Sequence, residues 1–217
     1  MDRKKIYKKL EKSAIERYQT RFYKEGESYK SLGWGCTEDQ IKRFEVLVQN
    51  IDFNNRTVMD IGCGFSDFYG YLKRQGISCN YIGVDIIPEF LECCRKKYSE
   101  ATFIQANIML EKDILPEVDI VVTTGTLNLK FQDIDNMEYT KNFISNAFEK
   151  AKELMSLDFL STRLTDSYPK EDFVYYHDPV KVLEYCFKLT DNVKLIHNYE
   201  PIPQREGTMI LYKGEKN

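Results

Sequence analysis

Residues 57–64 read TVMDIGCG, a short apolar run that passes directly into a glycine turn. The apolar run is typical of a buried strand, and the glycines allow the backbone to turn sharply and approach a ligand closely. From Asp67 onward the pattern is that of a helix, whose first free N–H groups would face the turn. The stretch therefore predicts a strand, a turn and a helix, with a ligand site where the strand ends.

The rest of the chain alternates between short apolar runs and helical stretches. Further strands are expected at residues 80–85, 102–106, 118–124 and 157–160, and helices at 67–75, 88–98 and 138–154. Such alternation is typical of a parallel sheet covered by helices on both faces. After a helix that opens at Pro179, strands at 193–199 and 208–212 flank a segment with no room for a helix, so these two are expected to pair antiparallel.

The chain is predicted to be one domain, with a helical extension or lid over residues 1–52 in front of a sheet core over 53–217. An amphipathic helix is expected from about residue 4 to 23, because apolar residues recur there at helical spacing at Tyr7, Leu10, Ala14, Tyr18 and Phe22. Residues 26–36 show no periodicity and are expected to form a loop. Thr37 and Gln40 then form a capping-box pattern at the start of the next helix.

Composition narrows the class of protein. The 217 residues carry a net charge of -3, although residues 1–30 hold ten Lys or Arg against five Asp or Glu. This balance does not favour nucleic acid as the main partner. The basic segment could contact RNA or an anionic substrate, but a solvated helix face is the favoured interpretation. Without a long apolar run or a signal-peptide pattern, a cytoplasmic protein that does not enter a membrane is expected. The six cysteines show no metal-site spacing and are interpreted as reduced thiols, mostly buried.

Acidic residues around the glycine turn predict the kind of ligand. Asp85 ends the second strand 21 residues after Gly64, close to the offset at which a carboxylate accepts hydrogen bonds from ribose hydroxyls. Asp67 stands at the third glycine position of a dinucleotide fingerprint, and Asp60 precedes the turn. Carboxylates would repel a pyrophosphate but suit a cationic nucleoside. S-adenosylmethionine, which carries an ammonium and a sulfonium group, fits better than NAD.

These residues resemble class I S-adenosylmethionine-dependent methyltransferases. VMDIGCGFSD (58–67) is similar to their motif I, Asp85 to their ribose acid, and QANI (105–108) to the motif that flanks adenine. The resemblance implies a Rossmann-like α/β fold with a mixed seven-stranded sheet in the order 3-2-1-4-5-7-6, the last strand antiparallel. It implies a cofactor site formed by Asp60, Gly62, Cys63, Gly64, Asp67, Asp85, Ile86, Asn107, Ile108, Gly125 and Trp34.

A narrower resemblance is to a group of small bacterial methyltransferases. It is carried by GWGC (33–36), RFEVL (43–47), GTLN (125–128) and YYHDP (175–179). Members of that group are associated with surface-polysaccharide or secondary-metabolite pathways, which implies methylation of an O or N atom on a small-molecule or sugar-linked acceptor. Ser66 replaces the usual third glycine and Asn107 a common Asp, and both substitutes remain compatible with binding.

The acceptor side is less defined by the sequence. An acceptor pocket is expected between residues 26–36, 125–130 and 161–178, with His177 as general base and Asn128 as orienting group. Alternatively, Asp178 and Pro179 form the cap and first position of a helix, and His177 merely flanks them. Other residues weighed for the site are Lys130, His197, Tyr23, Tyr29 and Tyr168.

Two other functions stay open at this stage. The basic N-terminal helix would suit an RNA or protein methyltransferase, and a regulatory subunit could bind the cofactor without catalysis. Trp34 is equally open, because it could close over the cofactor or the acceptor, or anchor the N-terminal helix. No metal is expected at the site.

Overall fold

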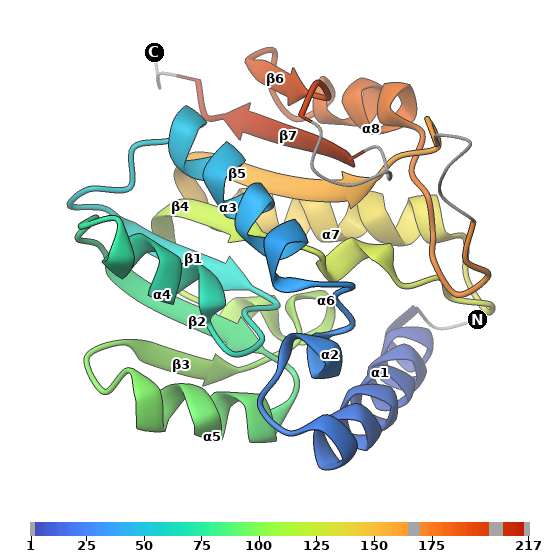
Figure 1. Ribbon diagram of the computed structural model, residues 1–217. Coiled ribbons are helices and arrows are strands. Elements are labelled where there is room, and N and C mark those ends of the chain that lie inside the picture. The colour runs from blue at the N-terminus through green and yellow to red at the C-terminus, as the bar shows by residue number, and fades with distance from the viewer. Residues whose placement is uncertain (1–2, 165–169, 200–205, 215–217) are drawn as a thin grey trace.

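The computed structural model describes residues 3–164, 170–199 and 206–214. One seven-stranded sheet forms its centre, in the order β3-β2-β1-β4-β5-β7-β6 (Figure 1). Neighbouring strands are parallel from β3 to β5, whereas β7 runs antiparallel to both β5 and β6. The strands are β1 (Thr57–Ile61), β2 (Asn80–Asp85), β3 (Thr102–Gln105), β4 (Val118–Thr123), β5 (Ala151–Leu160), β6 (Val193–Ile196) and β7 (Glu206–Tyr212). The strand order and the antiparallel end predicted from the sequence are confirmed.

Helices cover both faces of the sheet. One face packs against α3 (Thr37–Asn50), α4 (Asp67–Arg74) and α5 (Pro88–Lys97), and the other against α6 (Ile108–Glu111), α7 (Asn136–Lys150) and α8 (Pro179–Cys186). Two 3-10 turns, η1 (Lys112–Ile114) and η2 (Thr126–Asn128), follow α6 and β4. Successive strand residues point to opposite faces, so that Val58 packs under α3 and α4 while Met59 packs under α7. Two-sided burial explains why the strands read as nearly continuous apolar runs.

The N-terminal segment crosses the edge of the sheet at which the parallel strands end (Figure 1). It consists of α1 (Arg3–Glu25) and the short α2 (Tyr29–Leu32). Tyr7 and Leu10 are buried in the main core, and Tyr18 and Phe22 pack beside Phe65. The predicted apolar stripe therefore docks this helix on the sheet core.

Several predicted boundaries differ from the structure. Strand β5 begins at Ala151 and not at residue 157, so the expected helix over 138–154 ends at Lys150. AKELM (151–155) consists of good helix formers, but pairing with β4 and β7 on both sides overrides that preference. Strand β6 ends at Ile196, earlier than predicted, and α2 lies inside the expected loop over 26–36.

The capping box predicted at Thr37 is also wrong. Cys36 precedes the helix, Thr37 is already its first residue, and no side chain caps this end. The Gln40 amide instead donates to Asp67 Oδ2 at 3.1 Å, which ties α3 to the start of α4. All six cysteines are free, three of them buried and three half-buried. No helix in the described ranges has the length and apolarity needed to cross a membrane.

Candidate active site

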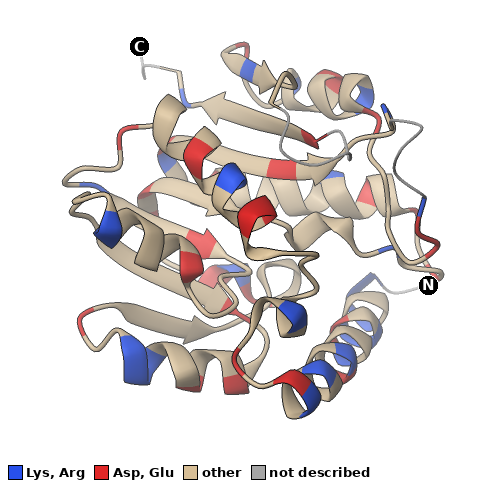
Figure 2. Cartoon of the chain, in the orientation of Figure 1, with Lys and Arg blue, Asp and Glu red and all other residues tan. Residues whose placement is uncertain are grey.

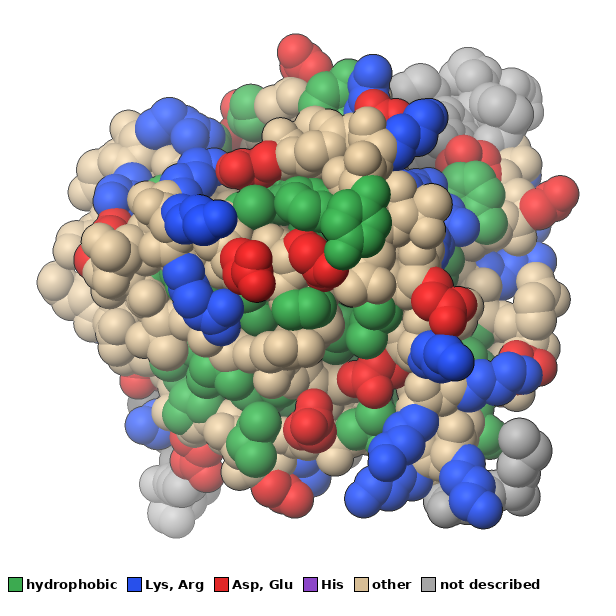
Figure 3. All heavy atoms as spheres, turned by 90° about the horizontal axis from the view of Figure 1, so that it is seen from below, with side chains coloured by type: hydrophobic (Ala, Val, Ile, Leu, Met, Phe, Trp, Pro, Cys, Tyr) green, Lys and Arg blue, Asp and Glu red, His purple; other side chains and the backbone are tan. Residues whose placement is uncertain are grey.

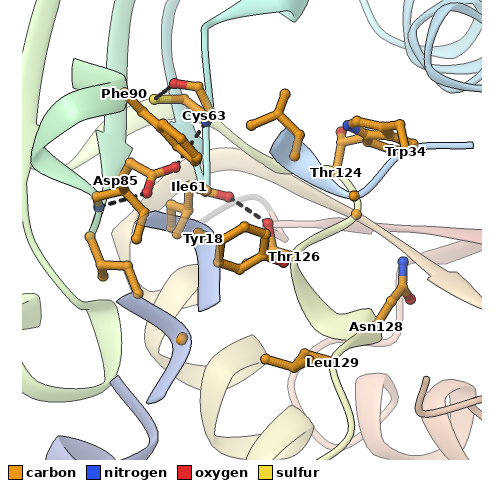
Figure 4. Close-up of a pocket in the computed structure, with 18 of the residues that line it drawn as sticks. Tyr18, Trp34, Ile61, Cys63, Asp85, Phe90, Thr124, Thr126, Asn128 and Leu129 are labelled. Carbon is orange, nitrogen blue, oxygen red and sulfur yellow. Dashed lines mark hydrogen bonds between the residues drawn. The ribbon is translucent and has the colours of Figure 1, made fainter. Parts of the chain in front are cut away.

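A cavity of about 620 Å³ lies at the carboxyl ends of the parallel strands, beneath α1 and α2. One side, called here the glycine-turn half, is lined by residues 60–64, 84–87 and 106–109. The other, called the aromatic half, is lined by Phe131, Tyr139, Phe143 and Phe173, with Leu129, Val174 and Arg17. In Figure 4, Asp85 and Phe90 lie on one side of the cavity and Trp34, Asn128 and Leu129 on the other. Ligands of open α/β sheets bind at this edge.

The glycine turn is held open by left-handed backbone at Gly62 (φ +79°) and Gly64 (φ +55°). A Cβ added at Gly62 would collide with the Thr126 side chain, so no other residue fits there without movement. Ser66 adopts the same left-handed region, at φ +57°, which accounts for the glycine usual at its position. The turn thus brings bare backbone to the cavity.

Asp85 braces this turn from the next strand. One carboxylate oxygen accepts from the backbone N–H of Gly64 and the other from that of Ile87, each at 2.9 Å. The N–H groups of Gly62 and Cys63 both donate to the carbonyl of Val84. The sequence-predicted acid therefore lies beside the sequence-predicted turn, with lone pairs to spare for a ligand.

Two buried carboxylates make the glycine-turn half of the cavity favourable for a positively charged ligand. Burial raises the pKa of Asp60 to about 7, although the Tyr81 hydroxyl donates to it at 2.6 Å. Burial likewise raises the pKa of Asp85 to about 6, against the lowering effect of its two backbone N–H donors. The charge of Asp85 adds to the rise at Asp60, so the two carboxylates repel one another. A cationic ligand between them would relieve that repulsion.

The remaining cofactor residues predicted from the sequence also line the cavity. Ile86 and Ile108 contribute apolar walls, and Asp67 lies at the first turn of α4. Asn107 uses its side-chain oxygen to accept from the N–H of Met109 at 2.9 Å and thereby caps α6. Asn107 thus lines the cavity, but its side-chain oxygen is engaged in the cap, and its contact with the cofactor stays a prediction.

Trp34 lies against Gly125, whose Cβ position would fall 2.9 Å from the indole ring. The Arg43 guanidinium stacks on that ring, 4.1 Å from its centroid. Arg43 is buried and pairs with Glu206 and Asp158, and Asp158 accepts from the Gly125 N–H at 2.6 Å.

This buried charge cluster of Arg43, Asp158 and Glu206 was missed by sequence reasoning. Its members come from α3, β5 and β7, far apart in the chain. Charged residues inside otherwise apolar helix and strand patterns are the only signal that could have marked them. The cluster fixes Trp34 and the turn after β4 against the sheet.

His177 lies outside the cavity lining. Its side chain is fully buried and Nε2 is 2.9 Å from the Thr140 hydroxyl, while Nδ1 has no hydrogen-bond partner among the described residues. Burial lowers the pKa of His177 to about 4, which makes it a weak proton acceptor. Asp178 caps α8 by accepting from the Val180 N–H, as the alternative interpretation requires. The geometry favours a packing role, and catalysis by His177 stays a prediction.

Asn128 does line the cavity. Its side-chain oxygen accepts from the Leu160 N–H at 3.0 Å, and its carbonyl accepts from the Tyr175 N–H. Asn128 thus joins the segments that follow β4 and β5, and its amide nitrogen, which bonds to none of the described residues, could donate to a ligand.

The three segments expected to form an acceptor pocket each contribute to the lining, through residues 30–35, 124–129 and 171–174. Lys130 and Tyr23 do not line it, and His197 bonds to the Ser161 hydroxyl at 2.8 Å. Tyr168 lies outside the described residues.

Cations of the N-terminal segment were missed as cavity residues. Arg17, Arg21 and Lys30 all line the cavity. The signal was present, because residues 10, 14, 17 and 21 follow one helical face, but only its apolar members were assigned to the stripe.

Comparison with known proteins agrees with this geometry. The family model described as "Methyltransferase domain" matches residues 52–206. The Mycobacterium tuberculosis protein Rv1506c, whose name describes a methyltransferase, is 24% identical over 149 residues, covering 66% of this chain and 86% of its own.

Solved structures share the fold at low identity. Magnesium protoporphyrin IX methyltransferase from Synechocystis PCC 6803, solved with bound SAM, has a TM-score of 0.62 at 17% identity, and each chain covers 97% of the other. The pyocyanin biosynthetic protein PhzM has a TM-score of 0.65 at 12% identity, over 91% of this chain and 62% of its own.

Proposed function

The chain belongs to the methyltransferase domain family, and we propose that it methylates an oxygen or nitrogen atom of a small-molecule or sugar-linked acceptor. It is an S-adenosylmethionine-dependent enzyme of class I fold. What we propose is the class of acceptor, and the observation that supports it is the form of the cavity. The cavity is roofed by α1 and α2 and continues from the glycine-turn half into the aromatic half. Its volume, about 620 Å³, is in the range of small-molecule sites.

The residues of the glycine-turn half fit the cofactor. Asp85 is placed to accept from ribose hydroxyls, and Ile86 and Ile108 form walls for a flat base. Asp60 and Asp67 supply negative charge for an ammonium and a sulfonium. S-adenosylmethionine supplies an activated methyl group whose leaving group needs no acid. The protein's own contribution is alignment, worth up to about 7 to 11 kcal/mol in well-oriented reactions.

The acceptor would occupy the aromatic half. Asn128, at the junction of the two halves, has an amide donor available to orient it. The turn at Gly125, fixed by Asp158 and Trp34, also lines the cavity. Catalysis in this arrangement depends on holding the acceptor atom in line with the methyl group.

An RNA or protein acceptor is less well supported. The cations of α1 are interspersed with acids along the helix (Figure 2), and Arg3 and Lys9 pair with Glu138 and Asp133. On the face shown in Figure 3, basic and acidic side chains are mixed without a continuous basic surface. The apolar side of α1 packs against the sheet core.

Methylation of a metabolite extract tests the proposal. The protein is incubated with S-adenosylmethionine carrying a deuterated methyl group and the small-molecule fraction of a cell extract, and products are identified by the mass shift of the label. A labelled small molecule is expected, with Gly62→Ala protein as the inactive control. Label found only in the RNA or protein fraction would contradict the acceptor class. Cofactor binding without any labelled product would favour a regulatory subunit.

A further inference from the structure

We infer that the acceptor is an aromatic molecule with an anionic group, a carboxylate or a phosphate, and that Arg17 and Arg21 of α1 bind that anion. The inference rests on the proposed function, because it names the class of acceptor for the same cavity. It is carried by the placement of two arginines and by the rings around them.

Arg17 and Arg21 stand one helical turn apart and both line the cavity. Residues four apart on a helix project from the same face, so the two guanidinium groups can approach a single anion. A Cβ added at Gly33 would fall 2.5 Å from the Arg21 guanidinium, so this glycine makes room for the side chain. The Arg17 guanidinium lies 4.8 Å from the centroid of the Phe173 ring, at the rim of the aromatic half.

In the part of the chain that the structure describes, neither arginine forms a salt bridge. Among the described residues, no carboxylate lies within salt-bridge distance of Arg17 or Arg21, whereas Arg3, Lys9 and Lys12 of the same helix each have one. Both arginines are half-buried, so part of their hydration is already lost. Planar guanidinium groups bind carboxylates and phosphates through paired hydrogen bonds, which favours an anion as their ligand.

The aromatic side chains beside the two arginines favour a ligand that contains an aromatic ring. Phe131 and Tyr139 meet edge to face, with centroids 4.9 Å apart, and Phe143 and Phe173 complete the lining. Leu129 and Val174, joined by a β-bridge, add apolar surface. Such a wall packs well against an aromatic face.

The cofactor's own carboxylate is the other possible source of an anion. The contact of Arg17 with Phe173 places that guanidinium beside the segment after β5, in the aromatic half. Asp85 and the glycine turn lie in the opposite half (Figure 4). For Arg17 this placement favours the acceptor as the source; Arg21 lies against Gly33, and for it the calorimetry below distinguishes the two sources.

Calorimetry on full-length protein saturated with S-adenosylhomocysteine tests the inference. The probes are para-hydroxybenzoate, phenyl phosphate and the neutral para-hydroxybenzamide. At least one acid should bind, and the amide should bind about tenfold more weakly or worse, because it lacks the charge-assisted bonds. Arg17→Ala and Arg21→Ala should each weaken the acid by about ten- to a hundredfold, and Arg17→Lys by less than Arg17→Ala.

Arg3→Ala is the matched control, because Arg3 lies on the same helix outside the cavity lining and should leave acid binding unchanged. Affinity for S-adenosylhomocysteine should stay the same in the Arg17 variants. If Arg17→Ala weakens the cofactor product and spares the acid, the anion site belongs to the cofactor and the inference is wrong. Equal binding of acid and amide, or binding of neither acid to a protein that binds the cofactor product, also overturns it. Loss of cofactor binding by the unmodified protein would instead contradict the proposed function.

Discussion

The two halves of the cavity differ in how the chain builds them. The glycine-turn half comes mainly from two adjacent parallel strands, β1 and β2, and from the turns that directly follow them. The aromatic half is assembled from α1, the segment after β4, α7 and residues 171–174. Local geometry fixes the chemistry of the first, whereas the second depends on which remote segments the fold brings together. Substitutions should therefore act differently in the two halves.

The largest effect is expected from Gly62→Ala. A Cβ at φ +79° is strained, and it would collide with the Thr126 side chain. Affinity for S-adenosylhomocysteine, measured by calorimetry, should fall by about a hundredfold or more. Adding Thr126→Ala should restore part of it. Gly76→Ala is the control, since Gly76 has φ +73° but open space around its Cβ position. Unchanged affinity in Gly62→Ala would contradict the view that local backbone geometry determines binding in the glycine-turn half.

Asp85→Asn should have the next largest effect. It removes the negative charge from a side chain that accepts two backbone N–H bonds and that we propose also accepts from the ribose hydroxyls. Affinity for S-adenosylhomocysteine should fall by about ten- to a hundredfold. Asp119→Asn is a matched control, because Asp119 also accepts a backbone N–H, that of Thr57, at the opposite edge of the sheet. Similar losses in both variants would mean that Asp85 acts only through the fold.

Binding of S-adenosylmethionine should weaken as the solution becomes acidic. With pKa values of about 7 for Asp60 and about 6 for Asp85, protonation begins near neutrality and removes the charge that a cation needs. Affinity should fall by up to about tenfold for the first pH unit below 7. Asp60→Asn should flatten this dependence, and an affinity independent of pH between about 8 and 6 would contradict the electrostatic role.

The same carboxylate has the opposite effect on the ligand-free protein. Its folded pKa lies above the unfolded value of 3.8, so the folded state binds the proton more tightly. The contribution of Asp60 to stability is therefore present below about pH 4 and is lost as the pH rises through 7. Thermal unfolding of the ligand-free protein, compared with Asp60→Asn, should show this difference, and its absence would argue against the raised pKa.

The smallest effect on activity is expected from His177→Ala. The ring is buried against Phe159 and Tyr175 and bonds to Thr140. Its loss should lower the free energy of unfolding by about 1 to 3 kcal/mol while turnover per folded molecule changes by less than about tenfold. Thr140→Val should reproduce part of the stability loss. A drop in turnover of about a hundredfold with unchanged stability would restore the general-base interpretation.

The two halves of the cavity also differ in how well the sequence predicts them. Spacing alone predicts that Gly62, Gly64 and Asp85 lie together, because strand, turn and acid are close in the chain, and all three line the cavity. The chemistry of His177 suggests a base, but spacing does not reveal that the ring faces Thr140 and the core. Arg17 and Arg21 share a helical face with the buried Leu10 and Ala14, but the helix pattern does not show what lies opposite that face, so their charge alone favours a solvated position.

The alternating fold and the glycine turn with its acids could be predicted from the residues, and the strand order from the family resemblance. The fold pattern and the turn depend on periodicity and on short-range spacing, which can be read along the chain. The length of β5, the cluster of Arg43, Asp158 and Glu206, and the wall of rings beside Arg17 become visible only in the folded structure. Those features need contacts between residues far apart, and a side chain's surroundings are set by the packing of elements that its own segment does not encode.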